Sequence, residues 1–374
     1  MEIKGKQNIA KIFIDQIDGT NVNFSSINQI RALCDMEILK DSKIRIMPDV
    51  CPGIGTTIGS TFTYSDKIIP SLVSGDIGCG VTTMKLKNKN IELSKVDKII
   101  KEQLIERKKI DNILEKYQSQ INLNELYCKK YVDVERCQTK LIDLGGGNHF
   151  LEIDKDSKGQ LYITIHSGSR LLGQQIYDYY LNKGYKELND KTCNKLYTYL
   201  ENDLMIEYLH DMEIAVRFAS LDRESIIYTI AKFLKNKPIS KIESVHNYVD
   251  TQNKIIRKGA ISAQKNEELV IPISASPIYG GVIIGKGLGN IDWNFSAPHG
   301  AGRICSRAES KNMFSLSQFK ENMQNVHSMN ISKENIDESP MVYKRKEYIR
   351  ENIKDSVQID DILIPIYNYK KEEK

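Results

Sequence analysis

The sequence predicts an α+β protein. Short runs rich in β-branched and aromatic residues alternate with two long helical patterns, and glycine-rich turns join them. The chain has 374 residues, and its hydrophobic residues, 40% of the total, are spread along the whole length without an evident linker. We therefore expect a single large domain over residues 1–374, or two interlocked lobes.

Apolar periodicity predicts two long helical regions. The first covers 94–118, where Ser94 and Asp97 form a capping pair ahead of apolar residues at helical spacing. The second covers 200–235, and we expect a break near Leu221.

Strands are predicted where β-branched and aromatic residues cluster between turn signals. The segments FLEID and LYITIHSG flank the turn-rich DKDSKGQ and predict a hairpin over 150–168. Further strands are expected at 80–86, 242–249, 268–274 and 281–285. A last helix at 345–356 precedes the strand-like ILIPIYNYK.

Charge and cysteine content restrict the function classes. The net charge of +4 is only weakly basic, so any nucleic-acid surface must be a local patch. The N-terminal MEIKGKQNIAKIFID lacks the apolar stretch of a signal peptide, and no membrane-length apolar run follows, so we expect a cytoplasmic protein that does not enter a membrane.

Seven cysteines without a CxxC pair fit neither a disulfide scaffold nor a zinc ribbon. They are Cys34, Cys51, Cys79, Cys128, Cys137, Cys193 and Cys305.

Four of the six histidines stand beside glycine or at the end of an expected strand. They are His149, His166, His246 and His299. Each one alone is more often a structural histidine, and we expect the other two, His210 and His327, to lie at the surface. Four in similar surroundings favour a shared site.

A glycine-bounded turn, GDIGCG, brings a carboxylate and a thiolate together. Asp76 and Cys79 are three residues apart, so both side chains can reach one point. Carboxylate, thiolate and imidazole ligands together suit zinc, manganese or iron, and a thiolate can bridge two cations. The alternative is a buried structural cysteine behind a turn aspartate.

The segment SAPHGAGRICSR indicates phosphate chemistry. His299 is followed by Arg303 and Arg307, and glycines at 300 and 302 leave room for a large ligand. An imidazole nitrogen can attack phosphorus while guanidinium groups bind the phosphate oxygens. The HSGSR segment adds Arg170. There is no GxxxxGK[ST] loop, and GKGLGN lacks a strand-turn-helix setting, so a conventional nucleotide-binding fold is not expected.

Ten collinear motifs resemble the RtcB-type RNA ligases. They are MPDV, GIGTTIGS, SGDIGCGV, LGGGNHFLEI, IHSGSR, HNY, RKGA, SAPHGAGRICSR, DESPMVYK and PIYNYK. The resemblance implies mixed β-sheets flanked by helices around a central cleft for metal and nucleotide. It also implies a GTP- and manganese-dependent enzyme of tRNA splicing or RNA repair, which joins an RNA 3′-phosphate or 2′,3′-cyclic phosphate to a 5′-hydroxyl through a GMP-histidine intermediate. We expect a monomer that acts on RNA ends, with an activating protein as a possible partner.

The resemblance assigns roles residue by residue. Cys79 would bridge two manganese ions, and His299 would be the guanylylated nucleophile. The other metal ligands would be Asp76, His149, His166 and His246. The GTP contacts would be Asn148, Glu152 and Lys370, with Lys370 reading the guanine. The residues facing the RNA end or its phosphate would be Asp49, Arg170 and Arg303.

Several positions depart from the family pattern. The departures are Cys51 for His, Ile54 for Lys, PISAS at 272–276 for PGSMG, Gln252 for Glu and Asp222 for Asn. They suggest a divergent branch and keep two alternatives open. One is an RNA-end sensor that does not ligate, and the other is a metal-dependent phosphoesterase acting on cyclic phosphate.

Overall fold

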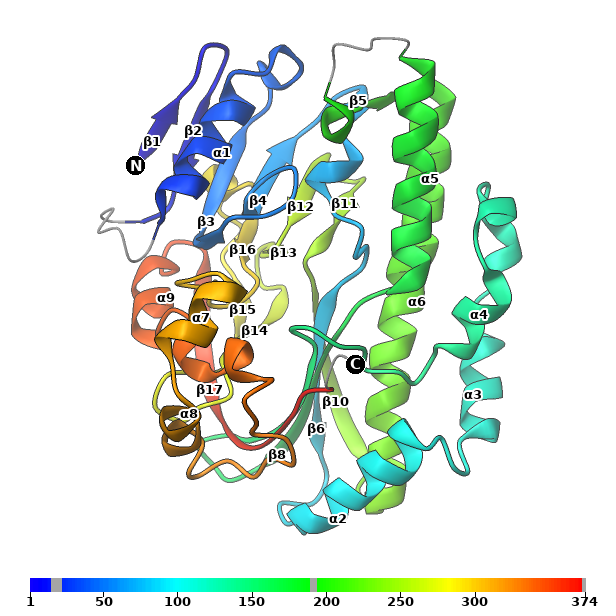
Figure 1. The fold of residues 1–374 in the computed structure, drawn as a ribbon, viewed down its shortest axis with the longest axis vertical. Coiled ribbons are helices and arrows are strands. Elements are labelled where there is room, and N and C mark those ends of the chain that lie inside the picture. The colour runs from blue at the N-terminus through cyan, green and yellow to red at the C-terminus, as the bar shows by residue number, and fades with distance from the viewer. Residues whose placement is uncertain (15–21, 189–193, 372–374) are drawn as a thin grey trace.

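Two β-sheets organise the fold of this computed structural model, which describes residues 1–14, 22–188 and 194–371 (Figure 1). The first sheet has the order β1 (Glu2–Lys4), β2 (Ile9–Ile12), β3 (Ile44–Cys51), β4 (Ile58–Thr63), β12 (Ile255–Lys258) and β11 (Asn247–Asp250). The second has the order β10 (Pro238–Val245), β6 (Gly80–Leu86), β8 (Leu161–Ser167), β7 (Phe150–Lys155), β17 (Val357–Tyr369), β15 (Gly281–Gly287) and β14 (Glu268–Ser274). The predicted α+β class is confirmed.

Short pairs of strands connect these sheets and their helices. The pair β13 (Ala260–Ser262) and β16 (Ser296–Pro298) lies between the sheets, because β13 contacts both β4 and β10 while β16 contacts β3. A second pair joins β5 (Lys67–Ile68) to β9 (Leu200–Glu201). The two sheets are therefore bridged at the point where the histidine-rich segments meet.

Two long helices pack together, and one of them covers one side of the second sheet (Figure 1). They are α5 (Leu171–Glu187) and α6 (Asn202–Leu234), and α6 contacts β6, β8 and β10. Short helices complete the layers: α1 (Phe24–Cys34), α2 (Leu93–Ile99), α3 (Asp111–Gln118), α4 (Val134–Thr139), α7 (Arg307–Met313), α8 (Leu316–Asn322) and α9 (Lys346–Asn352). Within the part of the chain that the structure describes, no helix is both long and apolar enough to cross a membrane.

Most predicted strands are confirmed. The hairpin forms from β7 and β8, which pair antiparallel, and β6, β14, β15 and the C-terminal strand also form. The segment 242–249 differs, because it divides into β10 of the second sheet and β11 of the first. His246 lies at this crossover, where its side chain faces neither sheet's regular ladder.

The predicted break of the helix near Leu221 is wrong. Helix α6 runs for 33 residues without interruption. The polar residues Asp222 and Arg223 in its middle are buried and bonded to other elements: Asp222 accepts from the backbone N–H of Asp143, and Arg223 pairs with Glu243 at 2.9 Å. These charges point inward and hold the sheet to the helix.

The predicted helix 94–118 is divided, and its predicted cap is wrong. Helix α2 begins after Glu92, with no side-chain cap, and the Ser94 hydroxyl instead donates to the Glu92 carboxylate. A π-helical segment, Ile100–Ile105, follows before α3. Arg107 has a φ of 55°, and its guanidinium donates to the carbonyl of Ile142, so a tertiary contact accompanies the break.

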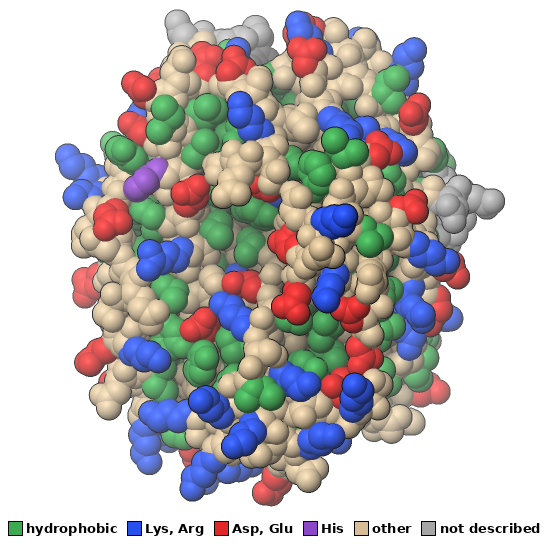
Figure 2. Space-filling view, turned by 180° about the vertical axis from the view of Figure 1, so that it is seen from behind, with side chains coloured by type: hydrophobic (Ala, Val, Ile, Leu, Met, Phe, Trp, Pro, Cys, Tyr) green, Lys and Arg blue, Asp and Glu red, His purple; other side chains and the backbone are tan. Residues whose placement is uncertain are grey.

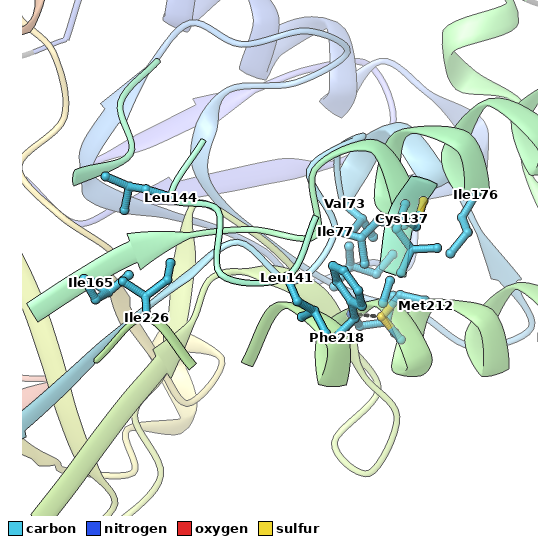
Figure 3. Packing of buried hydrophobic residues seen from close by; sticks show 14 of the residues in the cluster. Val73, Ile77, Cys137, Leu141, Leu144, Ile165, Ile176, Met212, Phe218 and Ile226 are labelled. Carbon is cyan, nitrogen blue, oxygen red and sulfur yellow. Dashed lines mark hydrogen bonds between the residues drawn. The ribbon is translucent and has the colours of Figure 1, made fainter. Parts of the chain in front are cut away.

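A continuous apolar core supports the loops that carry the histidines. Figure 3 shows Phe218 and Met212 of α6 packed near Ile77 and Leu141, and Leu144 in the loop before β7. Ile77 follows directly after Asp76, and Leu144 is five residues before His149, so burial of these two side chains anchors both loops. The described cysteines are all buried and free, while Cys193 lies outside the described residues.

Candidate active site and metal centre

The GDIGCG turn is held tightly against α6. Gly78 has a φ of +75°, and a Cβ there would lie 2.8 Å from the Cα of Val216. The Gly78 N–H donates to the Asn247 carbonyl at 2.8 Å, and Arg223 donates to the Gly78 carbonyl at 2.9 Å. The turn therefore presents Asp76 and Cys79 in one fixed arrangement.

Five side chains that are distant in the sequence converge at this turn. The Cys79 Sγ lies 3.4 Å from His149 Nε2 and 3.3 Å from His166 Nε2. His166 Nε2 lies 3.4 Å from His246 Nε2, and Asp76 Oδ2 lies 3.3 Å from His149 Nε2. Two sets of possible ligands result, each with its donor atoms within 4.8 Å of one another: Cys79, His166 and His246; and Asp76, Cys79 and His149.

Backbone carbonyls orient two of the imidazole rings. The His166 Nδ1 lies 3.2 Å from the Asn148 carbonyl, and the His149 Nδ1 lies 3.1 Å from the Leu144 carbonyl. A ring that donates from Nδ1 keeps its Nε2 lone pair for a cation. Arg170 Nη1 also lies 2.7 Å from His149 Nδ1, and this nitrogen cannot donate to Leu144 and accept from Arg170 at the same time.

Burial and neighbouring charges tune the protonation of the cluster. Burial, together with nearby histidines, lowers the pKa of His166 and of His246 well below the usual value, so both rings are neutral. Burial alone would raise the pKa of Asp76, but the hydrogen bond and attraction from His149 lower it to about 2. Burial and Asp76 raise the pKa of the Cys79 thiol well above its usual value, so a cation must displace that proton when it binds.

The donor set fits a pair of divalent cations. Cys79 belongs to both sets, so its sulfur can be shared, and the remaining ligands are imidazoles and one ionised carboxylate. This mixture suits manganese, zinc or iron rather than calcium or magnesium, which prefer oxygen ligands alone.

A buried carboxylate holds His299 beside this cluster. Asp49 is fully buried on β3, and its Oδ2 lies 2.6 Å from His299 Nδ1. The same oxygen accepts from the backbone N–H of His299 at 3.0 Å and of Gly300 at 3.3 Å. Donation from Nδ1 to Asp49 leaves Nε2 unprotonated, and the ring centroid lies 4.7 Å from that of His246.

Gly302 lets the loop of His299 close on β3. Its φ is +72°, and a Cβ would lie 1.9 Å from the Asp49 carbonyl oxygen. From the sequence we expected glycines 300 and 302 to keep a ligand site open. At Gly302 the observed constraint is instead the approach of the loop to Asp49, which secures the orientation of His299.

A cavity of about 770 Å³ opens in front of His299. Five residues predicted to bind GTP or RNA line it: Asn148, Glu152, His299, Arg303 and Lys370. This volume is in the range of small-molecule sites. The predicted nucleotide contacts and His299 thus lie around one space, and of the five predicted metal ligands His166 alone lines its wall.

One wall of the cavity carries a cluster of charged side chains around Glu338, a residue that the sequence analysis did not predict as part of the site. Glu338 accepts from Lys370 Nζ at 2.6 Å and pairs with Arg307 at 2.6 Å and with Arg303 at 3.4 Å. Burial would raise the pKa of Glu338, but Lys370 and Arg307 hold it below the usual value. Glu338 belongs to the DESPMVYK motif, which was the available signal for it.

A second buried acid lies on the same side. Glu152 accepts from the Asn368 amide at 2.9 Å, and its pKa is raised well above the usual value by burial and by Asp154. Burial therefore favours the protonated form of this carboxyl, which lines the cavity beside Asn368.

Two predicted RNA contacts lie elsewhere than expected. Asp49 does not line the cavity, because it is buried behind His299 and its Oδ2 is occupied there, so its contact with an RNA end stays a prediction. Arg170 does not line the cavity either, since its guanidinium packs on Gly145 and His149. Among the departures from the family pattern, Cys51 and residues 272–275 line the cavity, whereas Ile54 is exposed.

Comparison with known proteins gives a consistent result. The family model for tRNA-splicing ligase RtcB matches residues 29–132 and 95–371. The RNA-splicing ligase RtcB of Escherichia coli K12 is 28% identical over 358 residues, covering 84% of this chain and 87% of that protein. The tRNA-splicing ligase RtcB of Methanococcus maripaludis is 24% identical, covering 92% of this chain and 91% of its own length. The family model spans well over half of the sequence, and the chain therefore belongs to the RtcB family.

Proposed function

We propose that the protein joins RNA ends, an RNA 3′-phosphate or 2′,3′-cyclic phosphate to a 5′-hydroxyl, by way of a guanylylated His299. The single observation that carries this proposal is the pairing of Asp49 with His299 at the edge of both a ligand cluster and a cavity. The similarity to RNA-splicing and tRNA-splicing ligases supports the substrate class.

The first step forms a covalent bond at His299 Nε2. With Nδ1 donating to Asp49, Nε2 carries a lone pair and attacks the α-phosphorus of GTP. A phosphorus–nitrogen bond forms, the bond to the bridging oxygen breaks, and pyrophosphate leaves. The buried Asp49 carboxylate stabilises the ring as it gains positive charge, in the way that a buried aspartate serves a catalytic histidine.

Two further displacements complete the reaction. An oxygen of the RNA 3′-phosphate attacks the GMP phosphorus, and the bond to His299 breaks. The 5′-hydroxyl of the second RNA then attacks the activated 3′-phosphorus, which forms the new phosphodiester and releases GMP. A 2′,3′-cyclic end is opened by water to the 3′-phosphate beforehand.

The residues around the cavity have complementary tasks. Asp76, Cys79, His149, His166 and His246 would hold two manganese ions, which when bound stabilise negative charge on phosphate oxygens. The Arg303 Nη2 is buried without a hydrogen-bond partner among the described residues, and Arg303 lines the cavity, so it can bind a phosphate oxygen. Lys370, Glu152 and Asn148 would contact the guanosine.

A ligation assay tests this proposal against both alternatives. The protein is incubated with manganese, an RNA that ends in 3′-phosphate or 2′,3′-cyclic phosphate, and a 5′-hydroxyl RNA, with and without GTP. A joined product that requires GTP is the expected result. Opening of the cyclic end without GTP and without joining would select a phosphoesterase, and binding of RNA ends without any chemical change would select a sensor.

A further inference from the structure

A groove of about 480 Å³ lies outside the cavity of His299, near the end of the β7–β8 hairpin. Its wall includes Lys89, Lys155 and the amide side chains of Asn325 and Gln324, together with His327, whose Nε2 lies 2.7 Å from Asp97 Oδ2. None of these residues belongs to the ligand cluster or to the nucleotide contacts described above. The groove therefore offers hydrogen-bond donors and positive charge for which the proposed reaction has no use.

Lysines lie in and beside this groove, all of them exposed except the half-buried Lys155. We define the lysine patch as Lys87, Lys89, Lys155, Lys158, Lys235 and Lys237. Backbone contacts bring its loops together: the Lys87 N–H donates to the Lys237 carbonyl at 2.9 Å, and Lys89 Nζ donates to the Lys158 carbonyl at 3.0 Å. Figure 2 shows Lys and Arg side chains gathered at the lower end of the molecule, where α2 and the C-terminal end of α6 lie in Figure 1.

The lysines of the patch form no ion pair with the carboxylates around them. Across the described ranges, no salt bridge involves any of its six lysines. The nearby carboxylates have other partners: Asp156 accepts from the backbone of Lys158 and Gln160, and Asp361 accepts from Ser157. On a chain whose net charge is only +4, this is a local surplus.

The groove and the cavity are neighbours along β17. Ile366 lines the groove, whereas Asn368 and Lys370 line the cavity. His327 pairs with this strand between them, because its N–H donates to Ile366 at 3.0 Å and its carbonyl accepts from Asn368 at 2.9 Å. Along β7, Lys155 is six residues from His149, which corresponds to roughly 20 Å at about 3.3 Å per residue.

We propose that the lysine patch and its groove bind the phosphate backbone of the RNA whose end enters the cavity. This inference rests on the proposed function for the identity of the ligand. Regularly spaced phosphates suit several unpaired lysines spread over such a distance, and amide side chains in a groove suit sugar hydroxyls. A lipid surface is less well matched, because its headgroups form a flat layer that cannot fill a groove of this volume.

The test compares two triple variants with the same change in charge. The patch variant is Lys87→Ala, Lys89→Ala, Lys237→Ala. The control variant is Lys186→Ala, Lys286→Ala, Lys354→Ala, three exposed lysines elsewhere that form no salt bridge with the described residues. Binding of an RNA hairpin with a 3′-phosphate overhang is measured over a range of salt concentrations. We expect the patch variant to bind about tenfold or more weakly near physiological salt, with a salt slope smaller by about 2–3, and the control to change little.

Three results would overturn the proposal that the lysine patch binds RNA. Equal losses in both triple variants would overturn the proposal, as would an unchanged affinity in the patch variant. Loss of binding to phosphatidylglycerol vesicles with RNA affinity intact would also overturn it, in favour of a membrane surface. Labelling of His299 by GTP should be the same in both variants and in the parent. If the parent shows no labelling but the patch variant still loses affinity for RNA, the proposed function is wrong and the proposed RNA-binding surface is still supported.

Discussion

The ligand cluster and the nucleophile are built on different sheets. The ligands come from loops and strands of the second sheet and from the crossover at His246, and they touch one another directly. His299 follows β16 and is held by Asp49 from the first sheet, outside either set of ligands. The difference teaches that the ligand cluster and His299 have separate supports, so the support of His299 can be removed while metal binding is measured.

The largest expected effect follows removal of the shared sulfur. Cys79→Ala takes a donor from both ligand sets, so we expect the affinity for manganese to fall by more than about 100-fold and the labelling of His299 to disappear with it. Metal content after dialysis and titration calorimetry measure the first effect. Cys128→Ala, a buried cysteine away from the site, is the control, and equal metal loss there would show that the effect is unspecific.

Removal of the negative charge behind His299 should slow the labelling of His299 without changing metal binding. In Asp49→Asn the ring loses the carboxylate that stabilises its positive charge, so the rate of GTP labelling should fall by about 10²–10⁴-fold. Bound manganese should be unchanged, because Asp49 belongs to neither ligand set. Loss of metal together with labelling in Asp49→Asn would contradict the separation of the two supports.

Alanine substitutions at two glycines test whether the loop of His299 depends on its close approach to Asp49. Gly302 and Gly159 have nearly the same φ, +72° and +74°, but a Cβ meets Asp49 at Gly302 and nothing within 4 Å at Gly159. Gly159→Ala should lower the free energy of unfolding by about 1–2 kcal/mol, from backbone strain alone. Gly302→Ala should lower it by at least about 2 kcal/mol more, because the Cβ also clashes with Asp49. Urea unfolding measures both, and equal costs would mean that the loop does not depend on its approach to Asp49.

The smallest expected effect concerns a buried acid behind the ligand loops. Burial raises the pKa of Asp222 to about 7, and this carboxyl accepts from the Asp143 N–H and from Ser167 Oγ. Since the folded protein keeps this proton to a higher pH than the unfolded chain, the contribution of Asp222 to stability is present below pH about 4 and is lost as pH rises toward about 7.

Substitution by asparagine should remove that pH dependence. Asn can accept from Asp143 and donate to the Ser167 hydroxyl without a buried charge. The free energy of unfolding of Asp222→Asn, relative to that of the parent, should therefore rise by about 1–3 kcal/mol from pH 5 to pH 8. Unfolding free energies at the two pH values provide the measurement. An identical pH dependence in both proteins would show that Asp222 does not titrate in this window.

The fold was predictable where the pattern is local. Alternating and β-branched runs indicated the β7–β8 hairpin and the strands β6, β14 and β15. The uninterrupted α6 was missed because Asp222 and Arg223 look like a solvated turn in the sequence, while their partners Asp143 and Glu243 lie on other elements. The cap expected at Ser94 failed for a similar reason, since its hydroxyl bonds locally to Glu92 instead.

The site was predictable as a set of residue types but not as an arrangement. Glycine-flanked histidines and the Asp76–Cys79 spacing indicated the ligand groups, and the structure brings these residues together. No local signal could pair Asp49 with His299, because 250 residues separate them and only the contact of β3 with the loop after β16 joins them. The role of Gly302 depends on the same contact.

The most direct test of the central claim labels the protein with GTP that carries a radioactive α-phosphate, in the presence of manganese, and measures bound metal in the same samples of parent and His299→Ala. We expect a labelled band after denaturing electrophoresis in the parent, no band in the variant, and equal metal in both, because His299 belongs to neither ligand set. A variant that keeps the label, or that loses its metal, would contradict the assignment of His299 as a nucleophile supported separately from the ligand cluster.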